Sequence, residues 1–221
     1  MKLGFQALLK GGSGILLLGA LLFWPAGTLQ YYKGWLLMGL LFIPMLIVGV
    51  VLLKKDRALL EKRLSSKESE KEQRLVILVS SVEFAACFLL AGFDFRFGWS
   101  SFPLWLTIAA SVLFLAAYFI YVEVMRENAY LSRTVEVQEN QKVVDTGLYG
   151  VVRHPMYFGT ILLFWAMPLV LGSWPAFAVM LPYPLLLVKR IKNEEAVLET
   201  GLPGYTEYEK KVKYRLLPFI W

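Results

Sequence analysis

The sequence predicts an all-α protein, a multi-pass transmembrane helix bundle of five to six membrane helices that include a C-terminal helical hairpin. Of its 221 residues, 57% are hydrophobic and 15% are aromatic, which is outside the usual range for soluble domains. The chain also contains apolar runs close to the length of about 20 residues that a helix needs to cross a hydrocarbon core. We expect one membrane domain over residues 1–221.

The apolar runs follow one another along the chain with short or charged connections between them. Four of them span residues 12–27, 34–53, 75–93 and 102–122. We expect residues 1–53 to form two N-terminal membrane helices, 54–74 a cytosolic loop with a short surface helix, and 75–221 the catalytic core. The first run is expected to be a retained helix, since no small-x-small cleavage site follows it.

A fifth apolar run, 156–188, is interrupted at residues 172–175, Gly-Ser-Trp-Pro. This break predicts a tight turn between two helical arms. Each arm has about 16 residues, which is short for a crossing, so the arms extend into their polar flanks or form a shallow hairpin. In both cases the chain returns to the side from which it came.

The basic residues predict the orientation in the membrane. Of the 23 Lys and Arg, two precede the first run, eight lie in 54–74, four in 123–155 and seven in 189–221, whereas the opposite connections carry only Lys33 and Arg96. The positive-inside bias therefore places both termini and both long polar segments in the cytosol. The same distribution explains the net charge of +6 without nucleic acid.

The composition excludes several kinds of site. The chain has one cysteine, Cys87, and one histidine, His154, so we expect no disulfide, no zinc site and no other metal site. Glu83 lies at membrane depth, where an acid marks either a polar cavity or a buried hydrogen bond. We assign it no catalytic role.

The segment GLYGVVRHPMYFG, residues 147–159, is the first candidate for chemistry. Pro155 predicts the start of a helix, because its missing N–H costs nothing in the first turn. The free N–H groups and the helix dipole, reinforced by Arg153, would attract a carboxylate or phosphate. Taken singly, His154 is also compatible with a capping role, and Tyr149 and Tyr157 with an interfacial aromatic belt.

The second candidate is RIKNEEAVL, residues 190–198, which continues the last apolar run. Arg190 and Glu194 stand four residues apart on one helical face, as in an ordinary surface pair. Glu194 and Glu195 cannot share a face, so one is expected to pair with Arg190 while the other points at a ligand. The tail that follows predicts an interfacial helix ending before Pro218.

These segments together resemble the isoprenylcysteine carboxyl methyltransferase family. The resemblance rests on TGLYGVVRHPMYFG, RIKNEEAVLE and GYTEYEKKVKYRLLPFIW, and the stretches 94–100 and 124–138 look like its bacterial members. It runs from about residue 54 to the end of the chain. Lys142 departs from the family pattern, because many members have a histidine there.

The resemblance implies S-adenosylmethionine as the cofactor, bound at the cytosolic face of a bacterial cytoplasmic membrane. Carried over residue by residue, it implies a cofactor shell of Val144, Gly147, Tyr149, Arg153, His154, Pro155, Tyr157 and Glu195. Methyl transfer to a carboxylate needs alignment and no general base, because the carboxylate is already ionised at pH 7. Arg190 is the candidate for holding that carboxylate and Glu194 for orienting Arg190. The acceptor, a prenylated cysteine or a similar lipidic acid, would enter from the bilayer.

Three other functions remain open on the sequence. The RHPxY core and the tail also resemble membrane sterol reductases, which use NADPH, although Ala196 follows Glu194-Glu195 where those reductases have a cysteine. A phospholipid amine N-methyltransferase would use the same cofactor, but its amine must first lose a proton. A non-catalytic membrane scaffold or lipid binder is the fourth possibility.

Overall fold

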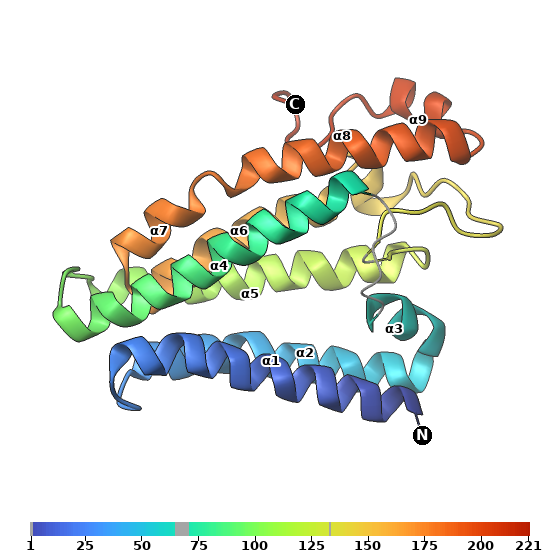
Figure 1. Cartoon of the computed structure of the whole chain (residues 1–221). Helices are drawn as coiled ribbons and strands as arrows, with labels where there is room; N and C mark the ends of the chain where they lie inside the picture. The colour runs from blue at the N-terminus through green and yellow to red at the C-terminus, as the bar shows by residue number, and fades with distance from the viewer. Residues whose placement is uncertain (1, 65–70, 133) are drawn as a thin grey trace.

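The computed structural model describes residues 2–64, 71–132 and 134–221, and this part of the chain folds as a bundle of α-helices (Figure 1). The predicted fold class is therefore confirmed. The helices are α1 (Lys2–Ala26), α2 (Tyr32–Lys55), α3 (Arg57–Leu64), α4 (Lys71–Phe97), α5 (Leu104–Glu127), the 3-10 helix η1 (Gly147–Gly150), α6 (Pro155–Leu171), α7 (Trp174–Met180), α8 (Tyr183–Gly201) and α9 (Tyr205–Lys211).

Four of the described helices are long and apolar enough to cross a membrane. These segments are Leu3–Ala26, Tyr32–Lys55, Gln73–Phe97 and Leu104–Glu127, and Pro155–Leu171 is a shorter apolar helix. Large apolar side chains such as Trp24, Trp105 and Phe119 are exposed on the outside of the bundle. A lipid environment accounts for this exposure, which water would not favour.

Small residues let the apolar helices approach one another closely. In Figure 1 the hairpin of α1 and α2 packs below α4, α5 and α6, while α7 and α8 lie above them. A Cβ on Gly92 of α4 would lie 2.6 Å from the carbonyl oxygen of Leu22 in α1. Ala91, Ala117 and Ala166 are fully buried at other helix contacts. Such close backbone contact is how helices associate in lipid, where burial from water contributes little.

The hairpin predicted over 156–188 forms in part. Helix α6 begins at Pro155, as expected, and ends at Leu171, where it is capped by Gly172, whose φ of 75° is left-handed. The Ser173 side chain then caps α7 by accepting a hydrogen bond from the Ala176 N–H at 3.2 Å. The second arm is not one helix, because α7 ends at Met180 and α8 begins at Tyr183 after Pro182. Proline has no N–H to continue the helix, which explains the second break.

The segment expected to be a solvated loop is partly packed against the bundle. In α3, Leu59 and Leu60 are buried, and Leu59 belongs to an apolar cluster with Val124 of α5 and with Tyr149 of η1. The leucine stripe therefore faces protein, where its burial is favourable. Residues 65–70 of the same predicted loop lie outside the described part of the chain.

The C-terminal tail corrects a further expectation. The predicted interfacial helix ends at Lys211, and the chain then runs in non-helical conformation to the end. The N–H groups of Arg153 and His154 donate to the carbonyls of Tyr214 and Arg215 at 2.9 and 2.8 Å. In the non-helical tail these carbonyls can accept hydrogen bonds from another segment, whereas in a helix they would accept from N–H groups of the helix itself. The tail thereby satisfies the N–H groups just before α6.

Candidate functional site

The residues that line a pocket come from one end of the bundle. In Figure 1 this is the end where α1 begins and where α3 and α9 lie, and we call it the pocket end. The 128–144 loop, η1, the start of α6, α8 and α9 supply the walls of this pocket. The empty space that these walls border is about 850 Å³, which includes open solvent at the mouth. The RHP segment and the first charged turns of α8 therefore meet at one site, as the resemblance implied.

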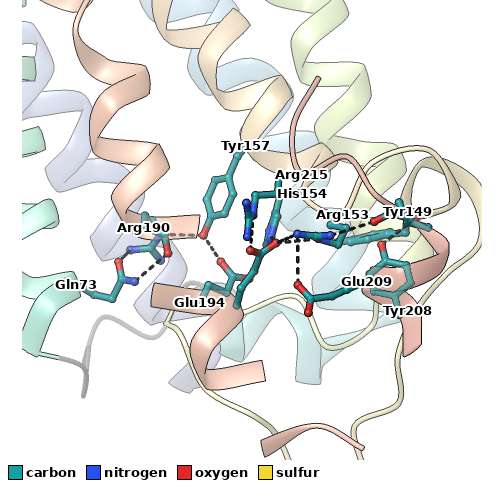
Figure 2. Close-up of polar contacts among 12 residues, drawn as sticks. Gln73, Tyr149, Arg153, His154, Tyr157, Arg190, Glu194, Tyr208, Glu209 and Arg215 are labelled. Carbon is teal, nitrogen blue, oxygen red and sulfur yellow. Dashed lines mark hydrogen bonds and ion pairs between the residues drawn. The ribbon is translucent and has the colours of Figure 1, made fainter. Parts of the chain in front are cut away.

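Glu195 is the centre of a buried ion cluster beside this pocket, and its partners Arg153, His154 and Arg215 are labelled in Figure 2. Its side chain is 2% exposed, and its Oε1 accepts hydrogen bonds from Arg153 Nε at 2.8 Å and lies 3.1 Å from His154 Nε2. The Nε of Arg215, on the tail, donates to Glu195 Oε2 at 2.5 Å. Three segments far apart in the sequence are thus tied to one carboxylate.

The cluster also determines the ionisation of Glu195. Burial by itself raises the pKa of this carboxyl group. The opposing effects are the hydrogen bonds from His154 and Arg215 and the nearby charges of His154 and Arg153. They outweigh burial and lower the pKa from 4.5 to about 2. Glu195 is therefore ionised at neutral pH. A buried carboxylate with several charge-assisted hydrogen bonds is a firm anchor for the surrounding side chains.

A second polar cluster connects α6 to α8 through the hydroxyl of Tyr157, and α8 to α4 through Arg190. Arg190 Nε donates to this hydroxyl at 2.9 Å, and the hydroxyl donates to Glu194 Oε2 at 2.5 Å. Figure 2 shows the Tyr157 hydroxyl between the two side chains. The predicted coupling of Arg190 to Glu194 thus includes a bridge through a tyrosine from another helix.

Gln73 of α4 completes this second cluster and was not predicted from the sequence. Its Oε1 accepts a hydrogen bond from Arg190 Nη1 at 3.1 Å, and its Nε2 donates to the Arg190 carbonyl at 3.3 Å. The two residues are 117 positions apart, and Gln73 is fully buried. The one signal in the sequence is an uncharged polar residue at the start of an apolar run, which is too common to be informative.

Tyr149 holds η1 between α5 and α9. Its hydroxyl accepts a hydrogen bond from Asn128 Nδ2 at 2.9 Å, and its carbonyl accepts one from the Tyr208 hydroxyl at 2.8 Å. Burial raises the pKa of Tyr149 above its ordinary value, so its hydroxyl stays protonated. Tyr149 is therefore a neutral, ordered part of the pocket wall.

The structure brings together most of the site residues predicted from the sequence. Those that line the pocket are Val144, Tyr149, Arg153, His154, Tyr157, Arg190 and Glu194. Gly147, Pro155 and Glu195 are not in its wall: Gly147, with φ +53°, packs on Glu127, Pro155 begins α6, and Glu195 holds Arg153 and His154. Lys142, where the sequence departs from the family pattern, lines the pocket. The binding roles of all these residues remain predictions.

The central part of the chain matches a known family. Residues 105–202 match the model of the phospholipid methyltransferase family. The matched stretch runs from α5 to the residue after α8 and contains both polar clusters except for Gln73 and Arg215. It supports a relationship to the membrane methyltransferases.

Two sterol reductases are also similar to this chain. The Delta(14)-sterol reductase TM7SF2 of Mus musculus is 30% identical over 91 residues, which are 40% of this chain and 22% of the reductase. The Delta(14)-sterol reductase of Methylotuvimicrobium alcaliphilum is 26% identical over 134 residues, 54% of this chain and 31% of the reductase. The chain thus spans less than a third of the length of either relative.

Proposed function

We propose that this protein is an S-adenosylmethionine-dependent methyltransferase that acts on a lipid-like acceptor embedded in the membrane. The observation that carries the proposal is the coincidence of the phospholipid methyltransferase match with the pocket wall, most of which lies within residues 105–202. The pocket lies at one end of a bundle of apolar helices, where a water-soluble cofactor and a lipid could meet.

The charge of the pocket favours S-adenosylmethionine over NADPH. The bases Lys142, Arg153 and Arg190 and the acids Glu136 and Glu194 line it, and Glu195 and Glu209 lie against Arg153 at 2.8 and 3.3 Å. These four acids thus offset the charge of the three bases. Net positive charge favours the phosphates of NADPH, whereas a zwitterionic amino acid with a sulfonium group suits a balanced site.

The residues present fit this cofactor. When bound, S-adenosylmethionine supplies an electrophilic methyl group on a sulfonium centre. Tyr149 and Tyr157 provide aromatic rings in the wall, and such rings attract cations. The Tyr157 ring stacks on the His154 ring with centroids 5.7 Å apart, so both rings are held in place.

Arg190 is the proposed ligand of an acceptor carboxylate. Gln73 and Tyr157 fix its guanidinium group, and an ordered guanidinium can bind a carboxylate through two parallel hydrogen bonds. The carboxylate attacks without losing a proton, so alignment is the main requirement. A prenylated cysteine or another lipidic acid fits this chemistry, with Arg190 and Glu194 as the catalytic residues.

Two alternatives have observations of their own. The match to a phospholipid methyltransferase model favours an amine acceptor, for which Glu194 would attract the ammonium form and then have to assist its deprotonation. The two sterol reductases favour NADPH-dependent reduction. The proposed orientation, with both termini and the pocket end cytosolic, follows from the positive-inside rule, and the proposed location in a bacterial cytoplasmic membrane rests on the family resemblance alone.

Calorimetry on the purified protein in detergent tests the proposal. We expect S-adenosylmethionine and S-adenosylhomocysteine to bind and NADPH not to bind. Binding of NADPH without S-adenosylhomocysteine would establish the reductase alternative, and binding of neither would favour a non-catalytic scaffold. Incubation with radiolabelled methyl donor and fractionated lipid extract then separates acidic from amine acceptors.

A further inference from the structure

The hydroxyl of Tyr205 is buried in the pocket wall and lacks a hydrogen-bond partner. Tyr205 begins α9 and is 4% exposed. Across residues 2–64, 71–132 and 134–221, the buried side chains with an unpartnered polar atom are Glu83, Thr107, Asn193 and Tyr205, and of these Tyr205 alone lines the pocket. It lies outside the stretch matched by the family model.

Tyr208, one turn further along α9, provides a contrast within the same helix. The two rings pack with centroids 5.7 Å apart, and both residues belong to one apolar cluster with Leu202 and Val212. The Tyr208 hydroxyl, however, donates to the Tyr149 carbonyl at 2.8 Å. The Tyr208 hydroxyl therefore serves the fold, while the burial of the Tyr205 hydroxyl is unfavourable unless a ligand supplies a partner.

The charges around Tyr205 indicate which kind of partner suits it. Burial, followed by the charges of Glu195 and Glu194, raises the pKa of the Tyr205 hydroxyl, and Arg153 is the cation that opposes them. The hydroxyl thus stays neutral at physiological pH, and the charges of Glu195 and Glu194 each act on it more strongly than that of Arg153. A cationic group that donates hydrogen bonds is favoured at such a point.

We propose that the Tyr205 hydroxyl oxygen accepts a hydrogen bond from an ammonium group of the bound ligand, with Glu194 and Glu195 supplying the favourable electrostatic field. This inference rests on the proposed function, in which the ammonium belongs to the amino-acid end of S-adenosylmethionine. It adds α9, beyond the matched stretch, to the binding site. It also places that end of the cofactor beside the acids of α8.

The test compares Tyr205→Phe with Tyr208→Phe, since each change removes one hydroxyl and keeps the ring. The ligands are S-adenosylhomocysteine and its deaminated analogue, which differ in the ammonium group. We expect Tyr205→Phe to weaken binding of S-adenosylhomocysteine by about tenfold or more and to leave binding of the analogue unchanged, because only the former donates to Tyr205.

Thermal unfolding in detergent provides a readout that needs no ligand. Tyr205→Phe should keep or raise the Tm of the protein, because it removes an unpartnered hydroxyl, whereas Tyr208→Phe should lower it, because it removes a formed hydrogen bond. A Tm for Tyr205→Phe as low as that of Tyr208→Phe would overturn the inference by indicating a structural partner.

The binding results separate this inference from the proposed function. Equal losses for both ligands, or no loss for either, would show that Tyr205 does not bind the ammonium group, while leaving the methyltransferase proposal in place. If the parent protein bound neither ligand, the proposed function and this inference would both be wrong.

Discussion

The Nε2 of His154 lies 3.1 Å from Glu195 Oε1, although the two residues are 41 positions apart in the chain. The same carboxylate binds Arg153 and Arg215. One buried acid therefore orders the RHP segment, α8 and the tail. This arrangement leads to the first two predictions.

Glu195→Gln should destabilise the protein strongly. The substitution keeps the shape of the side chain but leaves Arg153, whose side chain is 6% exposed, without its main charge partner. Breaking a buried ion pair in this way costs about 3–5 kcal/mol. Thermal unfolding in detergent measures the loss, with the exposed residue Glu139 changed to Gln as the control. Equal Tm values for the two variants would contradict the prediction.

Lowering the pH should remove the contribution of ionised Glu195 to the free energy of unfolding over a defined pH range. Because folding lowers its pKa from 4.5 to about 2, the stabilisation is complete above pH 4.5 and is lost as the pH falls toward 2. The shift corresponds to about 3 kcal/mol. Unfolding free energies of the parent and of Glu195→Gln should therefore converge between pH 4.5 and 2, and a constant difference across that range would argue against this ionisation.

Gln73→Leu should impair use of the acceptor while leaving cofactor binding intact. The change removes the amide that holds the Arg190 guanidinium at 3.1 Å, so Arg190 would no longer be fixed toward an acceptor carboxylate. We expect the kcat/KM for the acceptor to fall about tenfold, with an unchanged Kd for S-adenosylhomocysteine. Gln73→Glu, which can still accept from Arg190, should retain more activity than Gln73→Leu. If both variants matched the parent, Gln73 would have no positioning role.

His154→Ala and Arg190→Ala should affect different steps. His154 and Arg190 both line the pocket, and the His154 ring stacks on that of Tyr157, a proposed cofactor contact, whereas Arg190 is the proposed ligand of the acceptor. The first variant should weaken binding of S-adenosylhomocysteine, and the second should mainly reduce turnover of a carboxylate substrate. Calorimetry and a methyl-transfer assay on the same preparations measure the two effects. Identical behaviour of both variants in both assays would refute the division of roles.

Gly147→Ala should destabilise η1, which carries the pocket residue Tyr149, because of its effect on the backbone. Gly147 has φ +53°, and a Cβ there would lie 2.8 Å from Glu127 Cδ. Strain of this kind costs about 1–3 kcal/mol. Gly12→Ala is the matched control, because Gly12 lies in α1 and a Cβ added there would have nothing within 4 Å, so alanine should be neutral or stabilising. A lower Tm for Gly12→Ala than for Gly147→Ala would contradict this account.

Local sequence patterns predicted the helices well, because the features that start, continue and end a helix act over short distances along the chain. Runs of apolar residues, Pro155 at a helix start and Gly172 at a helix end act within a few residues of themselves. The second break was missed although Pro182 marks it in the sequence, whereas the end of α9 at Lys211 was missed because it depends on how the chain packs. In the tail, the carbonyls of Tyr214 and Arg215 pair with N–H groups some 60 residues earlier, and no local pattern records such pairing.

The sequence by itself determined the membrane character, the helical class and the two charged segments from which the pocket is built. The tertiary structure alone decided which side chains these charged residues contact. Glu194 and Glu195 are adjacent in the sequence, but the turn of the helix sends one to Tyr157 and the other to Arg153, His154 and Arg215. Which partner each acid reaches depends on contacts between helices, because ion pairs act over a few ångströms in space and are independent of separation along the chain.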